Sequence, residues 1–155
     1  MTQRSESGSG LIEVVVASAI VALVAVAFVG TFATLSQFHQ RDTLTIKGQL
    51  LAEEGLEAIL LMKGSGWETL SNLPKDEDEY LSLSSSWGTT STPEIVGGVF
   101  HRSFRLASVV RDGSDNIIPS GGSVDSGTLL ATVVVSWAWK GATSTVTYKT
   151  YVTSI

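Results

Sequence analysis

A nearly continuous apolar run at residues 14–29 constrains this chain more than any other feature. It contains Val, Ala, Ile, Leu and Phe with a single serine, and Gly30, Thr31 and Thr34 dilute it only afterwards. A helix of about 20 apolar residues crosses a hydrocarbon core roughly 30 Å thick. The sequence therefore predicts a membrane-spanning helix within residues 9–38.

Glu13 lies at the start of this run and is the only ionisable residue within residues 9–38. A carboxylate at mid-bilayer costs a few kcal/mol, and no side chain in the run carries the opposite charge. We therefore expect Glu13 to find its partner outside its own helix.

The residues before the run resemble the prepilin signature of type IV pilins and type II secretion pseudopilins. That signature has a short polar leader, a glycine at the cleavage site and a glutamate five residues into the mature chain. With Gly8 as the last leader residue, Ser9 is the first mature residue and Glu13 the fifth, whereas cleavage after Gly10 would make Glu13 the third. The resemblance implies a leader at residues 1–8 and cleavage between Gly8 and Ser9.

The resemblance also implies partners and a location. A prepilin peptidase would cut the leader on the cytoplasmic face, and Ser9 would then be the N-methylated residue. Leu11, Ile12 and Glu13 would carry assembly with other pilin subunits through an inner-membrane assembly platform. The chain would be a single-pass inner-membrane protein before assembly and part of an extracellular or periplasmic filament afterwards. Major pilin, minor pilin and secretion pseudopilin all remain open, and the Leu-Ile-Glu-Val start favours the last two.

Other interpretations of the N-terminus fit less well. A secretory signal has a basic region, then a short apolar region, and then a cleavage site with small residues. In this chain the small residues come before the apolar run. The main alternative is a non-polymerising, membrane-anchored extracellular binding module, for which Gly8 would stay uncut and Glu13 would be dispensable.

The helix is predicted to continue far beyond the span, because no proline occurs before Leu73. Apolar residues recur at spacings of about three and four, which is a helical period: Ile46, Leu50, Ala52, Leu56, Ile59 and Leu60. We expect one helix over residues 10–63, ended by the Gly-Ser-Gly at residues 64–66. Glycines inside it lower helix stability and predict places where it bends or loosens: Gly30, Gly48 and Gly55.

The second half of the helix and the following turn, residues 39–69, are apolar on more than one side. This pattern predicts two contacts, one with the chain's own globular domain and one with a neighbouring subunit. The acidic residues of this segment are expected on a solvated edge: Glu53, Glu54 and Glu57.

The remaining chain predicts a connector and a sheet. Residues 70–98 are rich in Ser, Thr, Gly and acids and predict a loop-rich connector and recognition surface. In residues 99–155, alternating apolar residues predict strands at 99–110, 128–140 and 143–153, with a hairpin at 140–143. Residues 112–127 are expected to form a long connection with a short strand at 116–118. The fold class is α+β, a long N-terminal helix packed against a small antiparallel sheet, as in pilins.

Composition excludes several kinds of function. The 155 residues leave room for one small globular domain beyond the span, and the formal charge of −5 argues against nucleic acid as a partner. The chain has no cysteine, hence no disulfide or thiol nucleophile. The serines lack a Gly-x-Ser-x-Gly elbow, so we expect no enzyme activity and no cofactor.

Few residues qualify as ligand sites. His39 and His101 lack metal-ligand spacing, and Trp137 and Trp139 are expected in the core rather than in a sugar-binding platform. Some pseudopilins bind calcium in a C-terminal loop, and the oxygen-rich loop here offers candidates for this: Asp112, Asp115 and Asn116. The alternative for these residues is an ordinary turn, for which Asp and Asn are suited.

Overall fold

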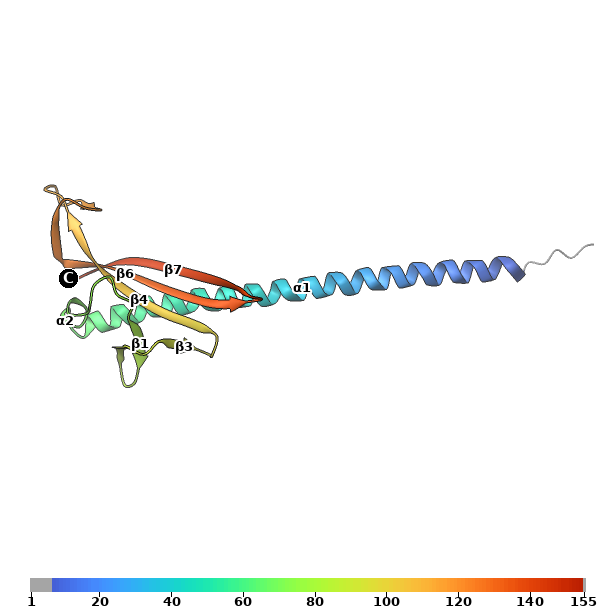
Figure 1. The fold of residues 1–155 in the computed structure, drawn as a ribbon, viewed down its shortest axis with the longest axis horizontal. Coiled ribbons are helices and arrows are strands. Elements are labelled where there is room, and N and C mark those ends of the chain that lie inside the picture. The colour runs from blue at the N-terminus through green and yellow to red at the C-terminus, as the bar shows by residue number, and fades with distance from the viewer. Residues whose placement is uncertain (1–6, 155) are drawn as a thin grey trace, which may run out of the picture. The chain divides into compact units, whose positions relative to one another are not determined.

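The computed structural model describes the backbone of residues 7–154 and the side chains of residues 10–154. The chain divides into two compact units, Met1–Thr43 and Leu44–Ile155. The sequence predicted that the second half of the helix starts at residue 39, close to this division. Helix α1, Ser7–Gly64, contributes to both units (Figure 1). Its end agrees with the predicted stop, since Lys63 lies in the last turn and Gly66 adopts a positive φ of 138°.

The first unit contains the apolar part of α1. Every described side chain from residue 10 to residue 43 is exposed within the chain. This part contains the single stretch among the described residues that is long and apolar enough to cross a membrane.

The second unit is a sheet packed on residues 44–64 of α1, which confirms the α+β fold class. Its main sheet has the order β3-β4-β6-β7, and β5 also pairs with β4. These strands are β3 Glu94–Val96, β4 Phe100–Arg111, β5 Ile117–Ile118, β6 Ser123–Trp139 and β7 Ala142–Thr153. All neighbouring strands in it are antiparallel. The three long strands and the short β5 agree with the predicted elements, although β6 begins inside the region expected to be a connection.

The turn between β6 and β7 is a two-residue hairpin at the predicted place. Lys140 and Gly141 both have positive φ, 49° and 81°, and Trp139 pairs with Ala142 on either side of them. This combination is the type I′ geometry whose twist matches that of the flanking strands.

The core lies between α1 and one face of the sheet. The helix presents residues spaced alternately by four and three positions: Gly48, Ala52, Gly55, Ile59 and Met62. The sheet presents the predicted apolar parity: Phe100, Phe104, Leu106, Leu129, Ala131, Val133, Val135 and Trp137. Trp137 is buried as expected, while Trp139 is partly buried at the core's margin.

Gly48 and Gly55 are contact points and not the loosening sites that propensity suggested. A Cβ on Gly48 would lie 2.5 Å from the Trp137 ring, and one on Gly55 would lie 2.8 Å from the Val133 side chain. Only glycine lets the helix backbone approach the sheet this closely. Because Trp137 fills the space opposite Gly48, the small residue and the large one complement each other.

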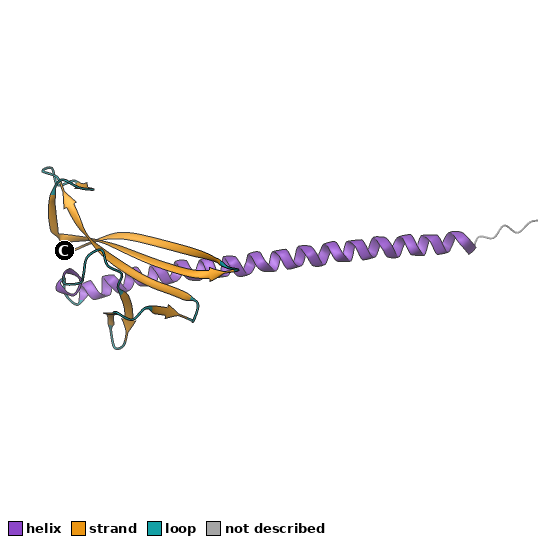
Figure 2. Ribbon diagram, viewed as in Figure 1, coloured by secondary structure: helices purple, strands orange, loops and turns teal. Residues whose placement is uncertain are grey.

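The connector holds short regular elements between its loops. α2, Glu68–Ser71, leads into it, and a two-stranded sheet of β1 Tyr80–Leu83 and β2 Trp87–Thr90 follows, then β3 (Figure 2). The acidic residues at 76–79 run along β4: the Asp76 N–H donates to the Leu106 carbonyl, and Glu79 exchanges two 2.8 Å hydrogen bonds with Phe104. These residues satisfy backbone groups along the edge of β4.

Candidate functional site

The predicted assembly residues lie at the beginning of α1. Leu11 and Ile12 are 69% and 65% exposed, and Glu13 is exposed next to them. Gly8 and Ser9 belong to α1 by their backbone, but their side chains and residues 1–6 lie outside the described part of the chain. Cleavage, N-methylation and assembly at these positions remain predictions.

The polar side chains within the apolar segment differ from Glu13 in their bonding. The hydroxyls of Ser18, Thr31 and Thr34 each donate a 2.9 Å hydrogen bond to a carbonyl three or four residues earlier. These bonds satisfy the hydroxyls within the helix. Among the described side chains, Glu13 has no hydrogen bond or ion pair.

The other apolar side of α1 is exposed in the second unit. Ile46, Leu50, Leu60 and Leu61 are about half exposed, while Ala52, Ala58, Ile59 and Met62 contact the sheet. The predicted contact with the chain's own domain is therefore confirmed, and the contact with a neighbouring subunit is untested. Glu53, Glu54 and Glu57 are exposed, as expected for a solvated edge.

A buried arginine that sequence reasoning missed joins the helix, the connector and the sheet. Arg102 on β4 is 2% exposed and binds Glu94 on β3 through two hydrogen bonds of 2.8 and 2.7 Å. Its Nη1 also donates to the Leu51 carbonyl at 3.1 Å and lies 3.3 Å from the Glu54 carboxylate. Burial lowers the pKa of Arg102, but the hydrogen bond and charge of Glu94 and the charge of Glu54 outweigh it and raise the pKa above its usual value.

Gly55 lies beside this contact. In a helix, the side chain of residue i+4 lies near the carbonyl of residue i, and Gly55 is four residues after Leu51. A Cβ on Gly55 would also lie 3.5 Å from Cδ of Arg102. At 3.5 Å this would be an ordinary van der Waals contact, so the close approach that requires glycine at position 55 is the one to Val133.

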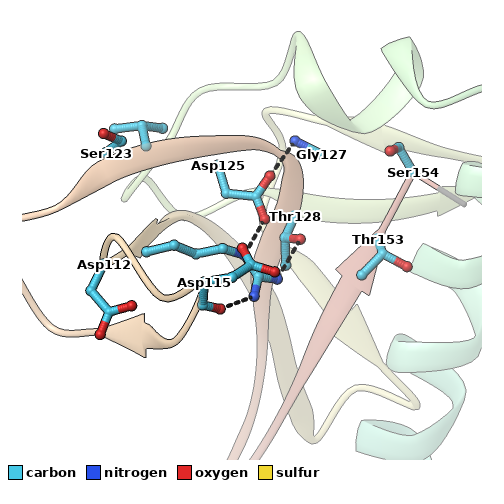
Figure 3. Close-up of a pocket in the computed structure, with 10 residues that line it drawn as sticks. Asp112, Asp115, Ser123, Asp125, Gly127, Thr128, Thr153 and Ser154 are labelled. Atoms are coloured by element: carbon cyan, nitrogen blue, oxygen red, sulfur yellow. Dashed lines mark hydrogen bonds and ion pairs between the residues drawn. The ribbon is translucent and has the colours of Figure 1, made fainter.

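The predicted oxygen-rich loop borders a cavity of about 490 Å³ at one end of the sheet (Figure 3). Here the pairing between β4 and β6 shifts after Ser108 and Leu129, so that Val109 pairs with Asp125 and residues 126–128 of β6 are skipped. The Arg111 guanidinium donates to Asp125 at 2.7 Å and to the Asp115 carbonyl at 2.8 Å. Hydrogen bonds from Thr128 and Arg111 and from the Gly127 N–H lower the pKa of Asp125 to about 2.

The calcium candidates form a turn around one carboxylate. Asp112 accepts hydrogen bonds from the backbone N–H groups of Ser114 and Asn116, and from the Asn116 side-chain amide. These bonds lower the pKa of Asp112, with the Asn116 side chain contributing most. The Arg111 guanidinium places a positive charge beside this loop, with Nε 3.6 Å from the Asp115 carboxylate. Within the described residues, no three His, Asp or Glu side chains are placed to hold a metal ion.

Comparison of the chain with protein-family models, with curated proteins and with solved structures gives no match.

Proposed function

We propose that this chain is a structural subunit of a type IV pilus or a type II secretion-like filament, matured by a prepilin peptidase and polymerised through α1. It would enter the inner membrane as a single-pass protein and leave it as part of an extracellular or periplasmic filament. Its role is structural rather than enzymatic.

The observation that best supports this proposal is the isolation of Glu13. The hydroxyls in the same segment are satisfied by their own helix, and Glu13 is the sole charge within residues 10–38. A buried carboxylate is tolerable in an apolar environment when a positive charge pairs with it. No residue within 10–38 carries such a charge, so it comes from outside this segment.

Cleavage after Gly8 would create that charge. A free α-amine has a pKa of about 7.7 to 8 and is largely protonated near neutral pH. In a filament of staggered parallel helices, the Ser9 ammonium of one subunit would meet the Glu13 carboxylate of another. This requirement explains why cleavage precedes assembly.

Intact-mass analysis of the protein recovered from the membrane and filament fractions tests the proposal. We expect a mature chain that begins at Ser9 in the filaments and the uncut chain in membranes of cells that lack the peptidase. A filament-free protein that begins at Met1 in all fractions would instead identify the membrane-anchored binding module.

A further inference from the structure

Strand β7 forms one edge of the main sheet. It pairs with β6 over its whole length, from Ala142 opposite Trp139 to Thr153 opposite Thr128, without a shift in register. On its other side, no strand among the described residues pairs with it. A continuous edge of this kind presents a row of backbone donors and acceptors.

The register identifies the outward-facing groups. The Ser154 N–H donates to the Gly127 carbonyl at 2.8 Å, so Ser154 faces β6. In an antiparallel ladder, residues alternate between facing the partner and facing away. The residues whose backbone groups point to the free edge are therefore the odd-numbered ones: Thr143, Thr145, Thr147, Lys149, Tyr151 and Thr153.

Most natural edges carry protection, and β7 has little of it. Proteins block edge strands with proline, bulges, short lengths or several charges. β7 has no proline, glycine or bulge, and its one charged residue is Lys149. The opposite edge of the sheet contrasts with it, because β3, residues 76–79 and β5 together cover β4.

We propose that the free edge of β7 is a strand-addition site for an extended segment of a different polypeptide. Among the described residues, a second copy of this chain offers no long free edge other than its own β7, because its β4 edge is already covered. Pairing of β7 with β7 across a two-fold axis would make the α1 helices of the two copies antiparallel. We exclude this β7–β7 dimer because the proposed filament needs parallel subunits, so this step rests on the proposed function.

The side chains along the edge define the chemistry of the partner. Lys149 has no hydrogen bond or ion pair among the described residues, and β7 contains no acid. An acidic side chain on the added strand, directly across from Lys149, complements it. Tyr151, two positions from Lys149, is 50% exposed on the same face of the strand. An apolar side chain on the added strand, two positions from the acid, would lie directly across from this ring and pack on it.

Panning of a phage-displayed library of random twelve-residue peptides on the full chain in dodecylmaltoside micelles tests this site. We expect enriched peptides to combine alternating apolar residues with an acid. The strongest peptide, synthesised and added back, should slow hydrogen exchange at the odd-numbered amides of β7. Failure to enrich peptides, protection elsewhere, or formation of β7-linked dimers of the chain itself would overturn the proposal.

Two variants make the test specific. Thr147→Pro removes an outward N–H without removing a bond to β6, and should weaken peptide binding about tenfold. Lys149→Glu should weaken binding of the acidic peptide about three- to fivefold. It should strengthen binding of a peptide in which that Glu is replaced by Lys. Lys47→Glu on α1 changes the net charge equally and should leave binding unchanged. If Thr147→Pro fails to fold, the charge reversal still tests the proposal. Equal affinity of Lys149→Glu and Lys47→Glu for the acidic peptide would show that the peptide does not bind at β7. Intact-mass analysis of processing does not depend on these variants, so the proposed function and the strand-addition site can fail separately.

Discussion

The two parts of α1 use small residues for different purposes. Gly30, in the apolar part, has nothing within 4 Å of the position its Cβ would take. Gly48 and Gly55, in the part that packs on the sheet, leave room for the Trp137 ring, the Val133 methyl groups and Arg102. One residue type is neutral in the first setting and required in the second, although the helix is continuous.

The large apolar residues differ in the same way. Leu11, Ile12 and Phe28 are exposed within the chain, whereas Ile59 and Met62 are buried in its core. Exposed apolar surface of that extent needs lipid or another protein to cover it. Helix propensity alone cannot separate the two parts, and the surroundings of each determine what its side chains do.

Separating the two parts should have the largest effect. A fragment of residues 37–155 contains the whole second unit and should be a soluble monomer that unfolds cooperatively, because α1 and the sheet close one core. Light scattering and thermal unfolding by circular dichroism measure this. Aggregation, or unfolding without a cooperative transition, would show that the second unit depends on the apolar part.

Removal of the buried guanidinium should be the most damaging single change in that fragment. Arg102→Ala leaves Glu94 partly buried without its partner, and should lower the free energy of unfolding by about 3 kcal/mol. Arg105→Ala removes a half-exposed pair with Asp78 and should cost less than about 1 kcal/mol. Urea unfolding of both variants gives the two values, and similar losses would deny Arg102 its special role.

The contrast between the glycines predicts a smaller difference. Gly48→Ala forces a methyl group against the Trp137 ring and should cost about 1–3 kcal/mol. Gly30→Ala meets open space and should change stability by less than about 1 kcal/mol, in the stabilising direction. Thermal unfolding of the full chain in dodecylmaltoside compares them. A Gly48→Ala chain as stable as Gly30→Ala would mean that the helix is not in close contact with the sheet.

Acid should reveal the smallest effect. The pKa of Asp125 falls from 3.8 to about 2 on folding, so its stabilising contribution is present above about pH 4 and is lost as pH falls toward 2. Asp125→Asn should therefore flatten the pH dependence of stability in this window, because the variant loses the most stability at pH 7 and less at pH 2. Urea midpoints of the 37–155 fragment at pH 2, 3, 4 and 7 measure it. If the urea midpoint of Asp125→Asn depended on pH as steeply as that of the unchanged fragment, Asp125 would not be the source of the pH dependence.

The sequence predicted the helix, the three long strands and the β6–β7 hairpin because apolar periodicity and turn residues are strong local signals. It missed β1, β2 and β3, which have 4, 4 and 3 residues and are too short to show a clear apolar alternation. Arg102 left a faint signal, since it lies on the same parity as Phe100 and Phe104 and interrupts an apolar face. Its partners Glu94 and Leu51 come from different elements, and no local pattern relates them.

The glycines and the register shift in β6 were unpredictable for a related reason. Propensity assigns Gly48 and Gly55 a cost, while their benefit arises only when Trp137 and Val133 approach from the sheet. The skipped residues 126–128 likewise place Asp125 beside Arg111, which spacing in the sequence does not suggest. Glu13 was visible for the opposite reason, because a single charge in an apolar run needs no tertiary information.

Incorporation of Glu13 variants into filaments tests most directly the claim that the first part of α1 is an assembly segment. Glu13→Val makes the span more apolar and leaves the second unit intact, so membrane insertion and folding should be normal. Co-expressed with wild type at matched levels, it should accumulate in membranes and be strongly depleted from sheared filaments, while Glu53→Val, on the exposed edge of α1, enters nearly normally. Equal recovery of the Glu13 variant and wild type in filaments would contradict the role assigned to this carboxylate.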